Sequence, residues 1–161
     1  MHAEAFQFIS RYATDGPVTV LDIGGRNING SALEHFPRAD ATVLDVAPGD
    51  GVHIVADAAS WEPDRAYDII VCAEVFEHTE SVAAICATAL AAAKRGGHFI
   101  VTCAGPGRLP HSGVDGGGVR PGEFYRNVEP GFLRKAMLVA GWVDVEVEHV
   151  GFDVRGHARK G

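Results

Sequence analysis

Short apolar, β-branched runs alternate with helical segments along most of this chain, and this alternation restricts the fold more than any other feature. The runs that we expect to form strands are residues 18–23, 41–46, 52–56, 67–72 and 97–103. Helical spacing or composition predicts helices over residues 3–13, 31–36, 80–94 and 130–140. Strands that alternate with helices imply a mostly parallel sheet with helices on both faces.

The last twenty or so residues follow a different pattern, because apolar and polar residues alternate there. This alternation predicts an antiparallel pair of strands that turns near Gly151, which brings the expected sheet to seven strands. Residues 105–122 are rich in glycine and proline, and so long a loop is uncommon unless it is functional or disordered. In the helix over residues 80–94, Thr79 is the expected N-cap. The length of 161 residues fits one domain over residues 1–161.

Charge and cysteine content narrow the partners and the compartment. The 14 basic and 21 acidic residues give a net charge of −7, which disfavours a nucleic-acid partner because phosphate binding needs a basic face. The three cysteines, at positions 72, 86 and 103, have no C-x-x-C spacing and indicate reduced thiols. The longest nearly apolar run, residues 82–93, is too short to span a bilayer. We therefore expect a cytoplasmic protein with no membrane partner.

An acid stands at or just after the end of each of the first four predicted strands: Asp22, Asp45, Asp57 and Glu74. In parallel sheets of this kind, ligands bind at the carboxyl ends of the strands. An acid about 20 residues after a glycine turn can accept both hydroxyls of a ribose, and Asp45 follows Gly24 at this distance. Each acid alone is equally consistent with capping a turn. The ordered set beside a glycine turn predicts an adenosine-like ligand.

The glycine turn itself, VLDIGGRNING over residues 20–30, excludes two kinds of nucleotide site. Gly25 and Gly30 have the spacing of a phosphate-binding loop, but Ser31 and Ala32 follow where that loop needs Lys-Ser or Lys-Thr. The G-x-G-x-x-G pattern of dinucleotide folds is absent. A nucleoside without a pyrophosphate remains, and S-adenosylmethionine (SAM) fits because its charged tail is an amino acid.

Five segments resemble, in this order, the successive motifs of class I SAM-dependent methyltransferases: VLDIGG, TVLDVAPG, ADAAS, YDIIVCAEVFEHTES and AAAKRGGHFIVTCAGP. The resemblance covers residues 18–105, and a weaker likeness continues through FYRNVEPGFLRKAMLVAGW. The most similar branch is the small single-domain type with an EVFEH segment and an LKPGG-like turn. It implies a Rossmann-like, doubly wound α/β sheet with an antiparallel C-terminal pair, SAM as cofactor, and methyl transfer as the activity.

The resemblance also implies where the cofactor contacts the first two strands. Asp22, Gly24 and Gly25 would line the methionine end of SAM. Asp45 would accept the ribose hydroxyls, and Val46 would lie beside the adenine.

Further along the chain, the resemblance places Asp57 and Ala58 at the adenine amine. Cys72, Ala73 and Glu74 would line the floor of the site near the methyl group.

The glycine loop departs from the family pattern D/E-x-G-x-G-x-G, because Arg26 and Asn27 follow the two glycines. A subset of the branch with an IGxRxxNGS segment is similar in this respect. Arg26, assigned with the cofactor residues, either points out of the loop or helps to form a cradle of a different shape. Asn27, Asn29 and Ser31 either contact the ligand or cap the next helix.

Methyl transfer depends mainly on holding the acceptor close and aligned, and a general base helps when the acceptor carries a proton. The candidates for a base are His78, His111, Tyr125 and Glu74. A basic cluster near His111 suggests an anionic acceptor or only a solvated loop: Arg108, Arg120 and Arg126. The remaining histidines lack the spacing of metal ligands, so no metal is predicted.

The sequence therefore predicts a SAM-dependent methyltransferase that acts on a small-molecule acceptor, and an anionic acceptor is one interpretation of the basic cluster. After the fourth strand, the D/N-P-P-[YF] motif of amino-methylating DNA enzymes is absent, which again disfavours nucleic acid. The short chain suggests an open substrate site or one completed by a second subunit, hence a possible homo-oligomer. The alternative is a non-catalytic SAM-binding or partner-subunit module with the same fold.

Overall fold

A computed structural model describes residues 2–161, and its centre is a seven-stranded sheet. The strands are β1 (Thr19–Ile23), β2 (Asp40–Asp45), β3 (Ile54–Val55), β4 (Tyr67–Ala73), β5 (Ala93–Ala104), β6 (Val143–Val150) and β7 (Asp153–Arg159). They lie in the order β3-β2-β1-β4-β5-β7-β6. The pairs among β1 to β5 are parallel, and β7 is antiparallel to both β5 and β6. The predicted mixed sheet with an antiparallel C-terminal pair is confirmed.

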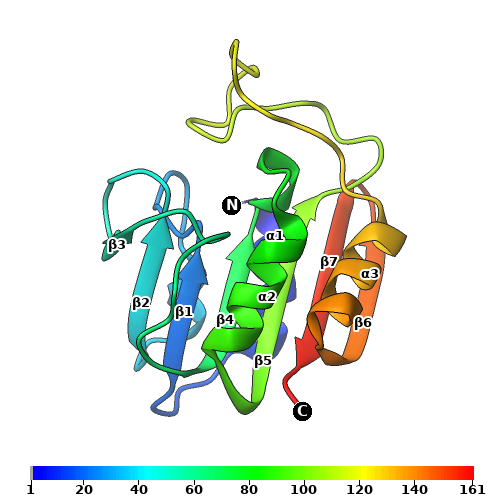
Figure 1. Ribbon diagram of the computed structural model, residues 1–161. Helices are drawn as coiled ribbons and strands as arrows, with labels where there is room; N and C mark the ends of the chain where they lie inside the picture. Colours follow the sequence, from blue (N-terminus) through cyan, green and yellow to red (C-terminus); the bar gives the residue numbers. More distant parts are fainter. Residues whose placement is uncertain (1) are drawn as a thin grey trace.

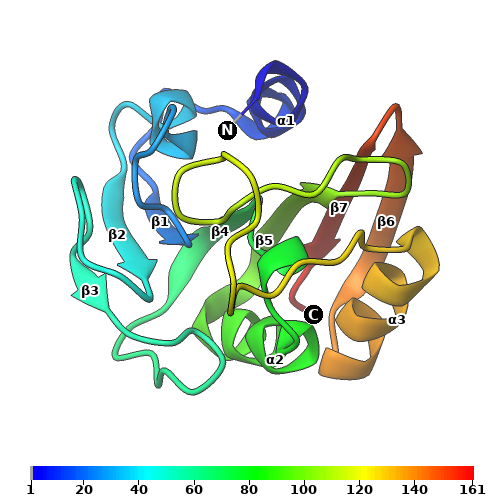
Figure 2. The same cartoon turned by 90° about the horizontal axis from the view of Figure 1, so that it is seen from above.

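Helices cover both faces of the sheet, as Figure 2 shows from above. On one face lie α2 (Val82–Ala92) and α3 (Pro130–Ala140). The other face carries α1 (Ala3–Ile9) and two short 3-10 helices, η1 (Ser10–Tyr12) and η2 (Ala32–His35). The helices predicted over residues 3–13 and 31–36 are therefore present, the second as a single 3-10 turn.

Side chains of the central strands alternate between these two layers, since successive residues of a strand point to opposite faces. Ile70 and Phe99 pack into the core beneath α2 and α3. Val71 and Ile100 pack into the core beneath α1. All four are fully buried, which explains why the sequence of these strands is apolar in continuous runs.

The boundaries of α2 differ from the prediction at both ends. The helix begins at Val82 with Ser81 as N-cap residue, and Thr79 instead accepts a hydrogen bond from the Ser81 backbone N–H in a turn (3.0 Å). It ends at Ala92, because the following residues pair with β4 as the start of β5. There Lys94 forms an ion pair with Asp68 (2.8 Å). Tertiary pairing thus overrides the helical composition of the last turn.

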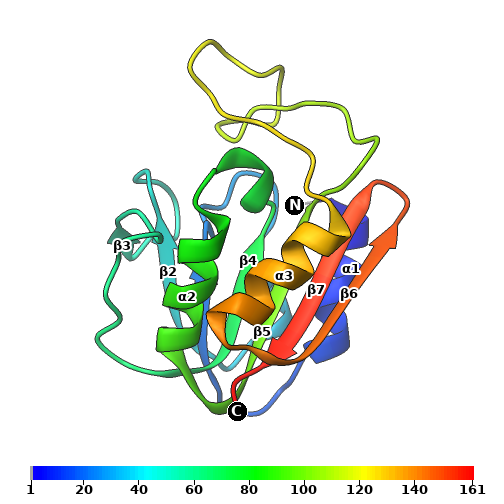
Figure 3. The same cartoon turned by 45° about the vertical axis from the view of Figure 1, so that its right-hand side comes forward.

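The boundaries of α3 match the prediction. Pro130 occupies the first turn, where its missing N–H costs nothing. Gly141, with φ of +105°, ends the helix in the left-handed conformation that glycine adopts without strain. Leu133 and Met137 on its inner face pack against β7, where Gly156 leaves room for them. In Figure 3, α3 lies in front of the sheet, to the left of β7 and β6.

A long connection between β5 and α3, residues 105–129, arches over the carboxyl ends of the strands (Figure 1). The sequence predicted an irregular segment here, and the structure extends it to residue 129. Within the described residues, no helix is long and apolar enough to cross a membrane. The fold therefore places the strand-end acids beneath this loop.

Candidate cofactor and acceptor site

A cavity of about 570 Å³ opens at the carboxyl ends of β1, β2 and β4, between these strand ends and the long loop. Ten of the eleven residues predicted for the cofactor line it: Asp22, Gly24, Gly25, Arg26, Asp45, Val46, Asp57, Ala58, Ala73 and Glu74. From the long loop, the lining includes Gly113, Val114 and Phe124. A volume of this size is within the range of small-molecule sites.

The placement expected for Cys72 is wrong. Its side chain is fully buried in the core beneath α2 and lies outside the cavity lining. The strand period explains this, because the last residues of β4 alternate between faces and only those at and beyond its end, Ala73 and Glu74, reach the cavity.

The two glycines after β1 are required by close packing. Gly24 has φ of +72°, and a Cβ there would approach Val75 to 2.2 Å. A Cβ on Gly25 would lie 2.5 Å from the carboxylate of Asp22 and 2.9 Å from Val43. Any larger residue would therefore displace the wall of the cavity. Gly30 also has a positive φ (+111°), but a Cβ placed there would meet none of the described residues within 4 Å.

The polar residues of the same loop have local roles. Asn27 accepts a hydrogen bond from the Gly30 backbone N–H (3.0 Å). Ser31 caps η2 by accepting from Leu33 N–H (3.2 Å), with Glu34 completing a capping box. Of the two readings left open for these residues, capping is observed for Ser31, which also lines the cavity.

Asp45 ends β2 and is nearly buried, with 9% of its surface exposed. Its carboxylate accepts backbone hydrogen bonds from Ala47 (2.9 Å) and Arg26 (3.3 Å). These bonds fix its orientation toward the cavity and leave further acceptor capacity on both oxygens. Asp57 similarly accepts from the Ala59 N–H (2.9 Å).

Asp22 lines the cavity and is nearly buried, with 3% of its surface exposed. Burial raises its pKa to about 7, and the nearby charge of Asp45 adds to this effect. Near neutral pH the carboxyl group is therefore close to half ionised. A cationic ligand beside it would favour the ionised form.

The side chain of Arg26 connects the glycine turn to the long loop. Its side chain lies against Gly49, where a Cβ would come within 2.5 Å of it. From there the guanidinium donates to the carbonyls of Gly113 (3.4 Å) and Val114 (3.3 Å) in the long loop. Arg26 therefore bridges the glycine turn and the loop above it, while it lines the cavity between them.

Glu74 occupies an unusual backbone conformation for a non-glycine residue, with φ of +58°. Burial is the largest influence and acts to raise its pKa, but the hydrogen bond with His2 (2.9 Å) and the charges of His2 and Arg108 together lower it. Strained backbone of this kind is concentrated at functional sites. The ionised carboxyl of Glu74 lies at the floor of the cavity.

The three remaining catalytic candidates form a cluster beside the cavity. The rings of His78 and His111 are 4.9 Å apart, and the Tyr125 ring lies 5.6 Å from the first and 5.1 Å from the second. His78 alone among them lines the cavity. Burial and the proximity of His111 lower the pKa of His78 to about 4, so its ring is neutral at pH 7. Burial raises the pKa of Tyr125 to about 12, and its hydroxyl donates to the Leu109 carbonyl (3.3 Å).

The arginines that suggested an anionic acceptor lie outside the cavity lining. Arg108 pairs with Asp153 (2.9 Å) and Arg120 pairs with Asp115. The guanidinium of Arg126 lies over the ring of Phe132 (4.5 Å). The structure therefore gives each of them a local partner.

Glu77 was not singled out from the sequence. Its side chain is fully buried, and its Oε1 accepts a hydrogen bond from the Ala104 N–H (3.0 Å). The group of possible metal ligands that it forms with His78 and His111 brings together residues up to 34 positions apart in the chain. The available signal was its place three residues after Glu74 in EVFEH, but the path of the long loop could not be read from the sequence.

Comparison with solved structures finds the same fold in several methyltransferases. A structure of DhpI in complex with SAH is 19% identical, with a TM-score of 0.73, and the match covers 98% of this chain and 84% of that one. The 1,6-didemethyltoxoflavin-N1-methyltransferase of Burkholderia thailandensis is 14% identical (TM-score 0.71; 97% and 78% covered). DesVI of Streptomyces venezuelae is also 14% identical (TM-score 0.72; 98% and 92% covered). A search of curated protein sequences finds no match.

A family model identifies the family of this chain, which structures of such low identity do not. A family model described as "Methyltransferase domain" matches residues 1–147. This range includes the glycine turn, all the strand-end acids and the long loop. The chain therefore belongs to the methyltransferase domain family.

Proposed function

We propose that this chain is a SAM-dependent methyltransferase that transfers a methyl group to a small-molecule acceptor. A single domain over residues 1–161 would carry both the cofactor and the acceptor site, and we expect it to act in the cytoplasm. Family membership supports the reaction class. DhpI was solved in complex with SAH (S-adenosylhomocysteine). The toxoflavin enzyme was solved with S-adenosylhomocysteine and with a small acceptor, 1,6-didemethyltoxoflavin.

The observation that carries this proposal is the charge of the cavity. Five acidic side chains line it: Asp22, Asp45, Asp57, Glu74 and Glu123. Among the described lining residues, Arg26 is the one arginine, and no lysine is present. An acidic cavity attracts the sulfonium and ammonium groups of SAM and repels the pyrophosphate of a dinucleotide. We therefore assign the ribose hydroxyls to Asp45, the adenine to Val46, Asp57 and Ala58, and the methionine end to Asp22.

The same acidity bears on the acceptor. It disfavours nucleic acid, whose phosphates would meet the carboxylates. It also gives an anionic acceptor little support beyond Arg26, so we propose a neutral or cationic small molecule in preference to an anionic one. His78, neutral and facing the cavity, is the group we propose to accept a proton from it. His111 and Tyr125 would hold the His78 ring in place.

Calorimetric titration with SAM and with NAD tests the cofactor. We expect heat with SAM and none with NAD. In Asp45→Asn, the loss of a charged acceptor should weaken SAM binding by about 10- to 100-fold, which corresponds to about 1.5–3 kcal/mol for a hydrogen bond to a charged group. Asp64→Asn is the matched control, because Asp64 is exposed and outside the cavity lining. Binding of NAD without binding of SAM would overturn the proposal.

Transfer of labelled methyl groups from SAM to a panel of small metabolites tests the activity. His78→Ala should lower kcat more than it changes SAM affinity. SAM binding with no transfer to any acceptor is the result expected of a non-catalytic module. Sedimentation tests the possible homo-oligomer: a fully active monomer would show that the chain's own loop, with Gly113 and Phe124, completes the site.

A further inference from the structure

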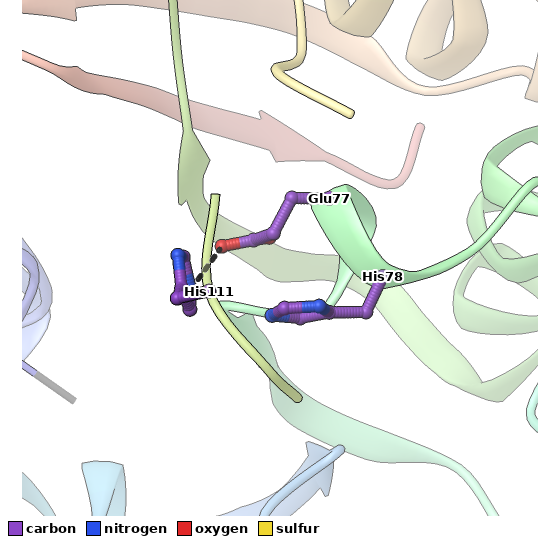
Figure 4. A group of neighbouring side chains, drawn as sticks. All are labelled: Glu77, His78 and His111. Atoms are coloured by element: carbon purple, nitrogen blue, oxygen red, sulfur yellow. Dashed lines mark ion pairs between the residues drawn. The ribbon is translucent and has the colours of Figure 1, made fainter. Parts of the chain in front are cut away.

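Three groups able to bind a metal ion converge beside the cavity, outside the positions assigned to SAM. Glu77 and His78 come from the 3-10 helix η3 (Phe76–His78), and His111 comes from the long loop. One ligand atom from each lies within 4.8 Å of the others. Figure 4 shows the three side chains pointing toward a common point.

Glu77 is the most constrained member of this cluster. Its side chain has no exposed surface, one oxygen accepts from Ala104 N–H, and the other, Oε2, has no hydrogen-bond partner among the described residues. A buried carboxylate with an unpaired oxygen is costly unless a cation or a proton compensates it. The nearest basic atom is Nε2 of His111, 3.9 Å from Oε1, which is too far for a hydrogen bond.

The hydrogen bonding of His111 indicates whether its ring can contact Glu77 directly or only through a bound cation. Its Nδ1 lies 3.3 Å from the carbonyl oxygen of Leu109. Because a carbonyl oxygen can only accept, Nδ1 carries the hydrogen, and in the neutral ring Nε2 presents a lone pair toward Glu77. When Glu77 is ionised, two acceptor groups thus face each other. Histidines that bind metals are held in this way, with the second ring N–H donated to a backbone carbonyl.

His78 completes the set from the cavity side. Its ring meets that of His111 edge-on at 4.9 Å, and it lines the cavity. A neutral imidazole offers the lone pair of one ring nitrogen to a metal ion. The cluster therefore combines a buried carboxylate with two imidazoles, one of them accessible from the cavity.

We propose that Glu77, His78 and His111 bind one divalent first-row transition-metal ion, with Zn²⁺ as the best-suited. Two nitrogen ligands and one oxygen ligand favour such ions over Mg²⁺ and Ca²⁺, which prefer oxygen. In tetrahedral coordination, two ligands bonded to Zn²⁺ at about 2.1 Å lie about 3.4 Å apart. The present spacing of up to 4.8 Å therefore needs to close by about 1.4 Å at its widest.

Three protein ligands leave a coordination position for water or an oxygen of the acceptor, as in catalytic zinc sites. Use of this position by an acceptor rests on the proposed methyl transfer. Metal binding itself does not, because it is measured without SAM or acceptor. With the metal bound, His78 is a ligand, so its proposed role as proton acceptor applies to the metal-free protein.

Titration of the metal-stripped protein with Co²⁺, followed by its visible absorption, and competition with Zn²⁺ test the site. We expect one ion per chain. His111→Ala should weaken Zn²⁺ binding by more than about 100-fold, since loss of an outer partner alone costs about 10- to 100-fold. Glu77→Gln, which keeps the shape of the side chain, should weaken it similarly. Far-UV circular dichroism verifies that both variants are folded.

His157→Ala is the matched control. His157 is half-buried and also lies beside a second histidine, His98, with 2.9 Å between their ring nitrogens. We expect this variant to bind Zn²⁺ within about twofold of the unmodified protein. The proposal is overturned if the protein binds no Co²⁺ or Zn²⁺, if folded His111→Ala binds as tightly as the unmodified protein, or if His157→Ala abolishes binding.

These assays test the proposed methyl transfer and the proposed metal site separately. A protein that binds Zn²⁺ through His111 but transfers no methyl group retains the metal site and loses the proposed activity. A protein that transfers methyl groups with no bound metal and no Zn²⁺ affinity retains the activity and loses the metal site.

Discussion

Replacement of Asp22 by Asn should make the protein more stable at neutral and alkaline pH. Burial raises the pKa of Asp22 to about 7, whereas in an unfolded chain it is about 3.9. The unfolded chain therefore loses this proton near pH 4 while the folded protein keeps it to about pH 7. The stability that the neutral carboxyl supplies is complete below pH 4 and is lost as the pH rises to about 7.

The loss in the free energy of unfolding follows from the difference between the two pKa values. Three pKa units at 1.36 kcal/mol each give a loss of about 4 kcal/mol by pH 8. Asparagine has the shape of the carboxyl group and no proton to lose, so Asp22→Asn avoids this loss. Between pH 5 and pH 8, its stability relative to the unmodified protein should rise by about 2–3 kcal/mol.

Urea denaturation of both proteins at intervals of half a pH unit, without ligand, measures this difference. Taking the difference at each pH removes the contributions of the other titrating groups, provided that they are unchanged. A difference that stays constant within about 0.5 kcal/mol from pH 5 to pH 8 would refute the reasoning, because Asp22 would then have the same pKa in both states.

SAM binding gives a second readout of the same group, which rests on the proposed function. If the ammonium group of SAM lies beside Asp22, only the ionised carboxyl binds it well. With a pKa of about 7, the ionised fraction rises about tenfold between pH 6 and pH 8, and SAM affinity should rise with it. In Asp22→Asn this part of the pH dependence should be absent. The same slope in both proteins would place the ammonium elsewhere.

Three further substitutions test the packing around the site. Gly25→Ala places a Cβ 2.5 Å from the carboxylate of Asp22 and should weaken SAM binding by at least about tenfold in calorimetry, whereas Gly118→Ala, with nothing within 4 Å, should leave it unchanged. Trp142→Phe removes an indole N–H that donates to a carbonyl of α2 (3.0 Å) and should lower the unfolding free energy by about 1–3 kcal/mol in urea; no change would show that this bond contributes nothing. Leu133→Ala leaves a void between α3 and the sheet and should cost about 2–5 kcal/mol, visible as a lower Tm, and a smaller loss would mean that the helix collapses into the space.

Hydrophobic pattern was sufficient to predict the sheet and the edge on which the site lies. Strands such as β4 are buried on both faces, so their sequence is apolar throughout and stands out. Once the strands are parallel, their ends share one edge, and this explains why Asp22, Asp45 and Glu74 line one cavity. No side-chain detail was needed for that step.

What the sequence did not predict depends on contacts between distant segments. Arg26 reaches the long loop through two carbonyls 87 and 88 positions further along the chain. His111 lies beside Glu77 only because the loop folds back over η3. Cys72 was misplaced for a local reason, since its face of β4 was assigned by motif position and not by the strand period.

The deviations from ordinary folding rules are concentrated around the cavity. Asp22 and Glu77 are buried carboxyl groups that form no close ion pair with an arginine or lysine of the described residues, and burial raises the pKa of both. Glu74 carries a positive φ, and the buried Nε of Arg26 has no partner among the described residues. Each of these features lowers the stability of the unliganded protein. Ligands that bind only the folded state restore stability by mass action, so a cation at Asp22 and a metal ion at Glu77 would offset the costs where they arise. The groups that destabilise the unliganded protein are thus the same groups that bind the ligands.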